Sequence, residues 1–225
     1  PMHAFDLSRI DGDIIVRMGA GEKLKLLDDT EVMVDDETLV IADHAKPLAM
    51  AGIMGGCDSS VSVTTNSIVL ESAWFNPLAI AGKARGYGKH TESSHRFERG
   101  VDPTIQVPAI ERATSLIIQI CGGFAGPIVL RESEYHLPKP AEIKLHDAWL
   151  EKQLGIRIDR KETDDILYRL GLECLAGDSE SGSWLSPPWR FDLDIQQDLV
   201  EEIARIYGYD NLPATTPTSV LAIPS

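Results

Sequence analysis

"PLAMAGIMGG", residues 47–56, is the stretch that most constrains the fold of the first half of the chain. An apolar run leads directly into a segment that holds three glycines. Apolar runs bounded by turn residues predict a buried strand, and glycine permits positive φ and close approach of backbone to backbone. The stretch therefore predicts a buried strand that runs into a tight turn. It is not a nucleotide-binding loop, because neither GxGxxG at a helix start nor GxxxxGK[ST] is present.

Short β-branched runs on both sides of this stretch predict further strands. Residues 13–18, 31–34 and 38–42 alternate with the turn-forming segments "GAGEK", "LDDT" and "DHAKP". "SIVLESAWF", residues 67–75, predicts another strand, and it carries Glu71 beside Leu70. An unpaired buried carboxylate costs several kcal/mol, so Glu71 is expected at a strand end, in a pair, or lining a pocket.

The second half of the chain changes character after a proline-punctuated linker, "YHLPKP" at 135–140. Before the linker, a helix is expected to follow Pro103, with Pro108 in its first turn. Its apolar residues recur at helical spacing: Ile110, Ala113, Leu116, Ile117 and Ile120. Gly122-Gly123 is expected to end it. After the linker, residues 159–172 and 196–209 predict two helices, the second ending at Gly208, and the segment around Pro187-Pro188 is expected to be extended.

The composition is that of an ordinary globular protein: 225 residues, 43% hydrophobic and 25% charged, with a net charge of -14. Each side of Pro138 contributes -7, which argues against general nucleic-acid binding. No apolar run approaches 18 residues, no signal peptide opens the chain, and the start "PMHAFD" indicates an excised piece of a longer protein. The three cysteines are far apart and lack metal-site spacing, as expected in a reducing cytoplasm.

"GKHTESSHRFERGVDP", residues 88–103, looks at first like a catalytic loop. It lacks the G-x-S-x-G turn of a serine hydrolase, and triad members rarely come from one short loop, so a freestanding protease or esterase is not supported. Five cations fall within residues 83–99: Lys83, Arg85, Lys89, Arg96 and Arg99. They either face a polyanion or pair with neighbouring carboxylates.

Two sets of residues are candidates for chemistry. His3, Glu71 and Thr91 come from three separate segments, as the members of real sites usually do, although each alone is more often structural. Asp192, Asp198, Glu201 and Glu202 form an acidic set, of which the last three share one helical face within reach of a hard cation. Acids in the first turn of a helix also complement its dipole without any metal, so both interpretations stay open.

Five strings together resemble the β subunit of bacterial phenylalanyl-tRNA synthetase: "PMHAFD", "PLAMAGIMGG", "VLESAWFNP", "GKHTESSHRFERGVDP" and "DLVEEIARIYGYDNLP". The first four resemble its B3/B4 module and the last its B5 module. The resemblance implies an α+β fold with mixed or antiparallel sheets and packed helices in the B3/B4 domain (1–137, truncated at its start). A small winged-helix-like α/β B5 domain (138–213) and a tail (214–225) are expected to follow.

The resemblance also implies an activity, the hydrolysis of tyrosine wrongly esterified to tRNA(Phe). In this interpretation Glu71 accepts the phenolic O–H, and His3 and Thr91 orient the ester and the attacking water. The remaining pocket residues are expected to be Pro1, Ala51, Gly52 and Ser93. Ser93 stands where the family often has alanine, and the family's upstream Thr-Asn pair would precede Pro1, so the piece alone is not expected to edit well.

The family further implies a magnesium ion shared with the α subunit and held by Asp192, Asp198, Glu201 and Glu202. Its other implied partners are tRNA(Phe) and an α2β2 heterotetramer in the cytoplasm, with ATP used only at the α subunit and with no role for DNA or a membrane. The competing hypothesis is a non-catalytic module that supports the α/β assembly and the docking of tRNA. Hydrolysis of mischarged tRNA by the isolated piece would speak against that hypothesis.

Overall fold

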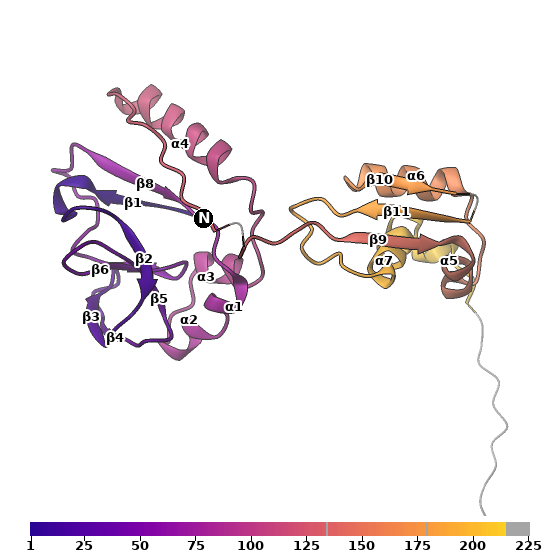
Figure 1. The fold of residues 1–225 in the computed structure, drawn as a ribbon, viewed down its shortest axis with the longest axis horizontal. Helices are drawn as coiled ribbons and strands as arrows, with labels where there is room; N and C mark the ends of the chain where they lie inside the picture. Colours follow the sequence, from indigo (N-terminus) through magenta and orange to yellow (C-terminus); the bar gives the residue numbers. More distant parts are fainter. Residues whose placement is uncertain (134, 179, 215–225) are drawn as a thin grey trace, which may run out of the picture. The chain divides into compact units, whose positions relative to one another are not determined.

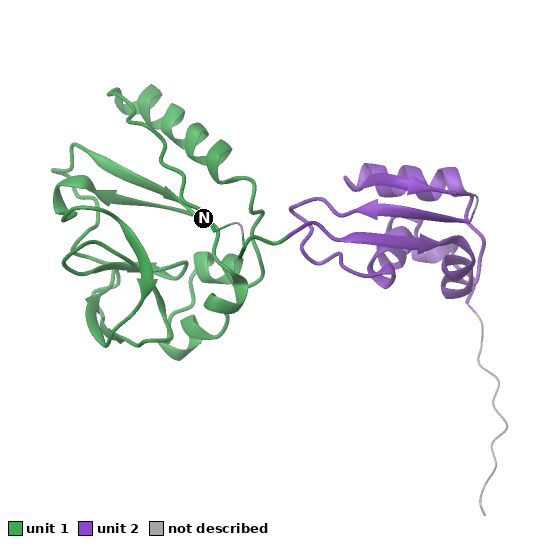
Figure 2. Ribbon diagram, in the orientation of Figure 1, with its two compact units in different colours: residues 1–138 green, residues 139–225 purple. Residues whose placement is uncertain are grey.

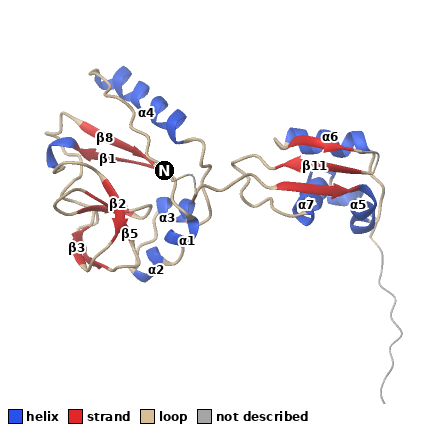
Figure 3. Ribbon diagram, viewed as in Figure 1, coloured by secondary structure: helices blue, strands red, loops and turns tan. Residues whose placement is uncertain are grey.

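The computed structural model of the protein describes residues 1–133, 135–178 and 180–214. They form two compact units, Pro1–Pro138 and Lys139–Ser225, which Figure 2 shows in separate colours. The chain is α+β, as expected, with antiparallel sheets in both units (Figure 3). No helix among the described residues is long and apolar enough to cross a membrane. The expected tail falls outside the described residues from position 215 onward.

The first unit is built from three small antiparallel sheets (Figure 1). The largest has the order β2-β5-β6-β7, and the other two pair β1 with β8 and β3 with β4. The strand bounds are β1 Met2–Asp6, β2 Ile15–Met18, β3 Glu22–Lys25, β4 Glu31–Val34, β5 Leu39–Ala42, β6 Pro47–Met50, β7 Met54–Gly55 and β8 Ile68–Ser72. The predicted strands at 13–18, 31–34 and 38–42 are confirmed as β2, β4 and β5. The strand predicted at 67–75 is shorter, because the chain leaves the β1 pairing after Ser72.

Strand β6 and the turn behind it form the centre of this unit, as the opening stretch predicts. All four residues of β6 are buried. The chain then turns through Gly52, whose φ is +69°, and β7 returns antiparallel to β6. The Gly56 N–H donates to the Leu48 carbonyl at 2.7 Å, and a Cβ on Gly56 would lie 2.5 Å from that same oxygen. Close backbone approach therefore requires the glycine here.

Four α-helices among the described residues of the first unit follow β8 along the chain: α1 Pro77–Ile80, α2 Lys83–Gly86, α3 Glu92–Phe97 and α4 Gln106–Cys121. A short 3-10 helix, η1 Leu7–Arg9, comes earlier, directly after β1. Ile80, Ala84 and Phe97 carry the three short helices into the core around β6. The segments that form α1 to α3 had not been predicted as helices, because one or two turns give no readable period.

The long helix α4 is confirmed, with Gly122 at its end in a positive-φ conformation. It lies along β8 (Figure 1). The apolar face expected from its spacing is only partly covered: Ile110, Ala113 and Ile117 are half-buried. Leu116 and Ile120 of the same series are 38% and 80% exposed.

The second unit is a three-stranded antiparallel sheet of order β10-β11-β9 with three helices packed against it. Its elements are β9 Glu142–His146, α5 Asp147–Leu154, α6 Arg160–Arg169, β10 Glu173–Gly177, β11 Ser181–Leu185, α7 Gln196–Tyr207 and η2 Tyr209–Asn211. Buried and exposed residues alternate along β9, so one face of the sheet packs on the helices. Trp184 of β11 and Leu199 and Ile203 of α7 are fully buried in this core. The two predicted helices are α6 and α7, while α5, β9 and β10 had not been predicted.

We expect Gly52→Ala to destabilise the first unit beyond the cost of its backbone conformation. A Cβ there would lie 3.0 Å from Phe97 and 3.2 Å from Ile80 and Phe75. The matched control is Gly21→Ala, since Gly21 has φ +71° and no atom within 4 Å of the added Cβ. The control should cost about 1–2 kcal/mol for the left-handed conformation. Gly52→Ala should cost about 1–3 kcal/mol more through overpacking.

Hydrogen exchange of the slowest amides in β5 and β6 measures this cost within the first unit, since a chain of two units need not unfold in one step. Equal losses in the two variants would mean that side-chain packing around Gly52 does not hold the turn.

Candidate active site

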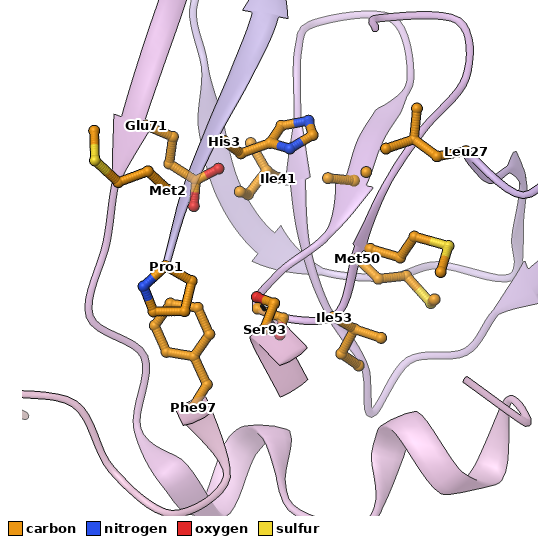
Figure 4. Close-up of a pocket in the computed structure, with 14 residues that line it drawn as sticks. Pro1, Met2, His3, Leu27, Ile41, Met50, Ile53, Glu71, Ser93 and Phe97 are labelled. Atoms are coloured by element: carbon orange, nitrogen blue, oxygen red, sulfur yellow. Dashed lines mark hydrogen bonds between the residues drawn. The ribbon is translucent and has the colours of Figure 1, made fainter. Parts of the chain in front are cut away.

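A cavity of about 200 Å³ opens in the first unit beside the turn at Gly52. Figure 4 shows Glu71 and His3 on one side of it and Leu27, Met50 and Ile53 on the other. The lining residues are Pro1, Met2, His3, Leu27, Ile41, Ala49, Met50, Gly52, Ile53, Met54, Gly55, Glu71, Ser93 and Phe97. The cavity is smaller than the 300–1,000 Å³ of typical drug-sized sites, so it suits one amino-acid side chain rather than a nucleotide. Its wall is largely apolar, with few polar groups.

Glu71 is the acidic group of this cavity. It lies on β8 directly opposite His3 of β1, and facing residues of an antiparallel pair have their Cβ atoms about 4.5–5.5 Å apart. Burial raises the pKa of the Glu71 carboxyl from 4.5 to about 7. No donor within the described residues makes a hydrogen bond to this carboxylate. Of the three placements open to Glu71, the structure shows the pocket wall.

His3 is the second titratable group of the cavity. Burial lowers the pKa of its imidazole, which is therefore neutral at pH 7. The Nε2 atom is buried and has no hydrogen-bond partner among the described residues. The ring meets Phe5 edge-on, with 4.6 Å between centroids, and packs on the backbone of Gly55. A Cβ on Gly55 would come within 2.6 Å of Nε2, so this glycine makes room for the ring.

Thr91 and Ser93 hold the turn that forms the cavity floor. Thr91 is the N-cap of α3, where its Oγ1 accepts from the Ser94 N–H at 3.0 Å and donates to the Ile53 carbonyl at 2.8 Å. The Ser93 hydroxyl donates to the Gly52 carbonyl at 3.0 Å. Two hydroxyls of one helix start thus fasten two successive carbonyls of the turn. We call this pair of bonds the hydroxyl clasp.

The expected site residues are therefore placed in two groups. Pro1, His3, Gly52, Glu71 and Ser93 line the cavity. Ala51 is fully buried behind the wall, and Thr91 reaches the cavity only through the carbonyl that it binds. A second cavity, of about 280 Å³, lies on the other face of α3 and includes Thr91 in its lining.

Several lining residues had not been expected. Met50, Ile53, Met54 and Gly55 belong to the apolar stretch 47–56, whose pattern indicates their place beside the turn. Ile41 lies on β5, Phe97 on α3 and Leu27 in the turn after β3, and no local pattern connects them to the site.

The cluster of cations at 83–99 is mostly neutralised within the described chain. Lys83 pairs with Glu37 at 2.8 Å, Arg96 with Glu92 at 3.2 Å, and Arg99 with Glu98 at 2.8 Å. Lys89 pairs with Asp28. Among the described residues only Arg85 of the five has no carboxylate partner. Pairing with neighbouring carboxylates, the simpler of the two interpretations, thus accounts for four of the five.

The acidic set of the second unit is arranged around arginines. Arg190 donates to Asp192 through Nε at 2.8 Å and Nη2 at 2.7 Å, and Nη2 also reaches Glu202 at 3.0 Å. Arg205 binds the other oxygen of Glu202. These contacts lower the pKa of Asp192; in Glu202 they outweigh burial, which acts the other way.

The two remaining acids play separate parts. Asp198 accepts the N–H groups of Asp194 and Ile195 at 2.8 and 2.9 Å, which caps the start of α7, and Glu201 is exposed. No group of three or more His, Cys, Asp or Glu in the described part of the chain could hold a metal ion. In this arrangement the four acids do not fit a magnesium ion.

Comparison with known proteins places both units. Residues 1–122 match the B3/4 domain and residues 143–209 the tRNA synthetase B5 domain. The phenylalanine–tRNA ligase beta subunit of Yersinia pestis is 55% identical over 217 residues, which cover 95% of this chain and 27% of that protein. The beta subunit of Shewanella oneidensis is 53% identical over 98% of this chain and 28% of its own length. The chain thus spans little more than a quarter of these relatives.

A solved structure is also similar, an N-terminal fragment of the phenylalanyl-tRNA synthetase beta subunit from Pyrococcus horikoshii. It has 15% sequence identity and a TM-score of 0.46, over 92% of this chain and 60% of that one. The first 122 residues match one family model, so the chain belongs to the B3/4 domain family, and a tRNA synthetase B5 domain follows. Across both domains, its relatives are more than half identical to it. The chain is therefore a member of the phenylalanine–tRNA ligase beta subunit family.

Proposed function

We propose that the cavity of the first unit hydrolyses tyrosine esterified to tRNA(Phe), as an editing site within a phenylalanine–tRNA ligase. One observation carries the proposal: Glu71 lines a small apolar cavity with no hydrogen-bond partner among the described residues, directly opposite His3, whose Nε2 atom is buried and also without a partner there. A carboxyl whose pKa is strongly raised at the wall of a cavity is typical of active sites.

Selectivity for tyrosine follows from the unpaired carboxylate. Tyrosine differs from phenylalanine by one hydroxyl, which an apolar pocket alone distinguishes poorly. A phenolic O–H donating to Glu71 would satisfy a buried acceptor that a phenyl ring leaves unpaired. Accepting this hydrogen bond also favours the ionised carboxylate, so a bound tyrosyl ring lowers the pKa of Glu71.

His3 supplies the basic group in this proposal. A neutral imidazole can accept a proton from a water molecule as that water attacks the ester carbonyl. The carbonyl carbon then loses the ribose oxygen of the tRNA, which leaves with a proton, and free tyrosine and tRNA result. No protein nucleophile is needed, because correct positioning of water against an activated ester supplies much of the rate.

The hydroxyl clasp positions the cavity rather than the reacting atoms. Both hydrogen bonds of the Thr91 hydroxyl are already made, one as donor and one as acceptor. Ser93 keeps free lone pairs on its hydroxyl oxygen and lines the cavity, so it adds polarity to the wall.

The rest of the proposal concerns the whole ligase. The relatives are named beta subunits, so we assign this chain a role beside an α subunit, in an α2β2 heterotetramer that binds tRNA(Phe). Activation of phenylalanine with ATP is assigned to the α subunit. No step of the proposed hydrolysis passes through a metal ion.

Replacing Glu71 with glutamine should reduce the preference for tyrosyl over phenylalanyl esters. A hydrogen bond to a charged group contributes about 1.5–3 kcal/mol, which corresponds to a loss of about 10- to 150-fold in the ratio of kcat/KM values. The measurement is deacylation of Tyr-tRNA(Phe) and Phe-tRNA(Phe) by the intact ligase. Glu31→Gln is the control, since Glu31 lies exposed on β4. A Glu71→Gln enzyme with unchanged preference would remove Glu71 from the proposal.

Burial of Glu71 should also make the first unit less stable as the pH rises. The folded pKa of about 7 exceeds the ordinary 4.5, so between these values the unfolded chain ionises first and the free energy of unfolding falls. Above pH 7 the loss levels off, at no more than about 3 kcal/mol. Glu71→Gln removes this dependence. The stability difference between variant and wild type should therefore be small at pH 4, grow up to pH 7 and then stay constant.

Hydrogen exchange of β5 and β6 amides at several pH values measures that difference. A difference that does not change with pH would show that Glu71 is solvated in the folded state.

Thr91→Val should destabilise the first unit by about 0.5–2 kcal/mol, the usual effect of losing an N-cap, and Thr91→Ser should restore it. Ser93→Ala, which removes one hydrogen bond to the Gly52 carbonyl and leaves the N-cap of α3 intact, should lower the free energy of unfolding by less. Neither change should shift the pH profile of ester hydrolysis, because neither residue exchanges a proton. Thr91→Val with full stability and greatly reduced hydrolysis would instead place the Thr91 hydroxyl on the substrate or its water.

A further inference from the structure

The acidic set of the second unit already contains its own counter-charge. Asp192 uses both oxygens on the planar guanidinium of Arg190, at 2.8 and 2.7 Å. Glu202 divides its oxygens between Arg190 and Arg205. A bidentate arginine–carboxylate pair is among the strongest protein hydrogen-bond arrangements. The negative charge of each of these two acids is therefore already compensated by an arginine.

Arg190 is held in place from several directions. The backbone N–H of Arg190 donates to the Pro187 carbonyl at 2.9 Å, and the Arg190 carbonyl accepts from the Leu193 N–H at 3.2 Å. Two consecutive backbone turns therefore fix the position of Arg190. Its side chain is only 20% exposed, and that of Glu202 only 11%. The guanidinium thus connects the loop before α7 with the second turn of that helix. Two acids on separate segments, the exposed Asp192 and the buried Glu202, are joined by one cation.

A divalent ion on the same two acids would meet Arg190 at short range. Arginine stays charged at any ordinary pH, so it cannot relieve the repulsion by losing a proton. The ion would also have to replace three charge-assisted hydrogen bonds. Binding of the metal and the contacts of Arg190 to Asp192 therefore compete.

We propose that Arg190 is the resident cation of this acidic set, that it holds the second unit together without a metal, and that Mg²⁺ binds Asp192 and Glu202 only by displacing its guanidinium. The proposal does not depend on the editing activity. It differs from a preformed magnesium site, in which the four acids would converge on a vacant centre. Here Asp198 caps a helix, Glu201 faces solvent, and the other two acids are paired.

The test is Mg²⁺ binding to the full chain, measured by titration calorimetry, for the wild type and for Arg190→Met. Methionine keeps much of the length of the side chain and removes its charge. The variant should bind Mg²⁺ at least 10-fold more tightly than the wild type. Arg169→Met is the control: Arg169 pairs with Asp165 on the exposed side of α6, and its loss should leave Mg²⁺ affinity unchanged.

Stability gives a second readout. Chelation with EDTA should leave the thermal unfolding midpoint of the wild-type second unit unchanged, whereas Mg²⁺ should raise the midpoint of Arg190→Met. If the methionine variant does not fold, Arg190→Lys replaces it in the test, because lysine keeps the positive charge but cannot make the two-pronged guanidinium contact with a carboxylate. It should bind Mg²⁺ more tightly than the wild type, but by less than 10-fold.

Two results would overturn the proposal. One is a wild-type chain whose second unit unfolds when EDTA removes a metal. The other is tight Mg²⁺ binding by the wild type while the Arg190 Nε–H resonance keeps its bonded position, because the ion and the guanidinium would then share the acids.

Discussion

The fold of the first unit depends on the close approach of the Gly56 backbone to the backbone of β6 at Leu48. Strand β6 is buried along its whole length, and the chain returns to it so tightly that Gly56 donates to Leu48 with no room for a side chain. The same reversal places Gly52 against Phe97, Ile80 and Phe75. Because the turn is fixed in this way, its two carbonyls face α3, and the hydroxyl clasp can form. The cavity is the space that this reversal leaves beside β1 and β8.

Within that cavity the ionised carboxylate of Glu71 lowers the free energy of unfolding, because burial disfavours its charge. The fold supplies no donor to the carboxylate among the described residues, so its ionised form is disfavoured and its pKa rises. A ligand with a hydroxyl at the right place removes part of this penalty, whereas one without it cannot. In the proposed editing reaction, selectivity would come from this unpaired acceptor in the free protein, and a site better satisfied on its own would discriminate less well.

Much of the fold could be predicted from the sequence, where the signal was local. The buried β6 and its glycine turn, the strands β2, β4 and β5, and the helices α4, α6 and α7 each follow from a pattern within about ten to fifteen residues. The helices α1 to α3, of one or two turns, are too short for a period to show, and the strands β9 and β10 lack the β-branched runs that mark β2, β4 and β5. The pairing of His3 with Glu71 could not be predicted either, because it depends on the register of two strands whose facing residues His3 and Glu71 are 68 positions apart. Resemblance to a family named both residues, but only the register explains why they meet.

Thr91 shows most clearly what spacing cannot reveal. Its position next to Ser93 and its family resemblance made it a candidate to orient the substrate, and its side chain is indeed close to the cavity. The structure, however, assigns its donor to Ile53 and one acceptor site to Ser94. A hydroxyl has one proton to donate, so a threonine that caps a helix and fastens a turn has none left for a ligand. The same reasoning applies to the acids of the second unit. Their spacing is compatible with a metal ion, but a cation that approaches carboxylates already bound by a guanidinium must displace that guanidinium or meet its positive charge at short range. Which of two partners an oxygen binds is decided by the residues around it in space, such as Arg190, and not by its neighbours in the chain.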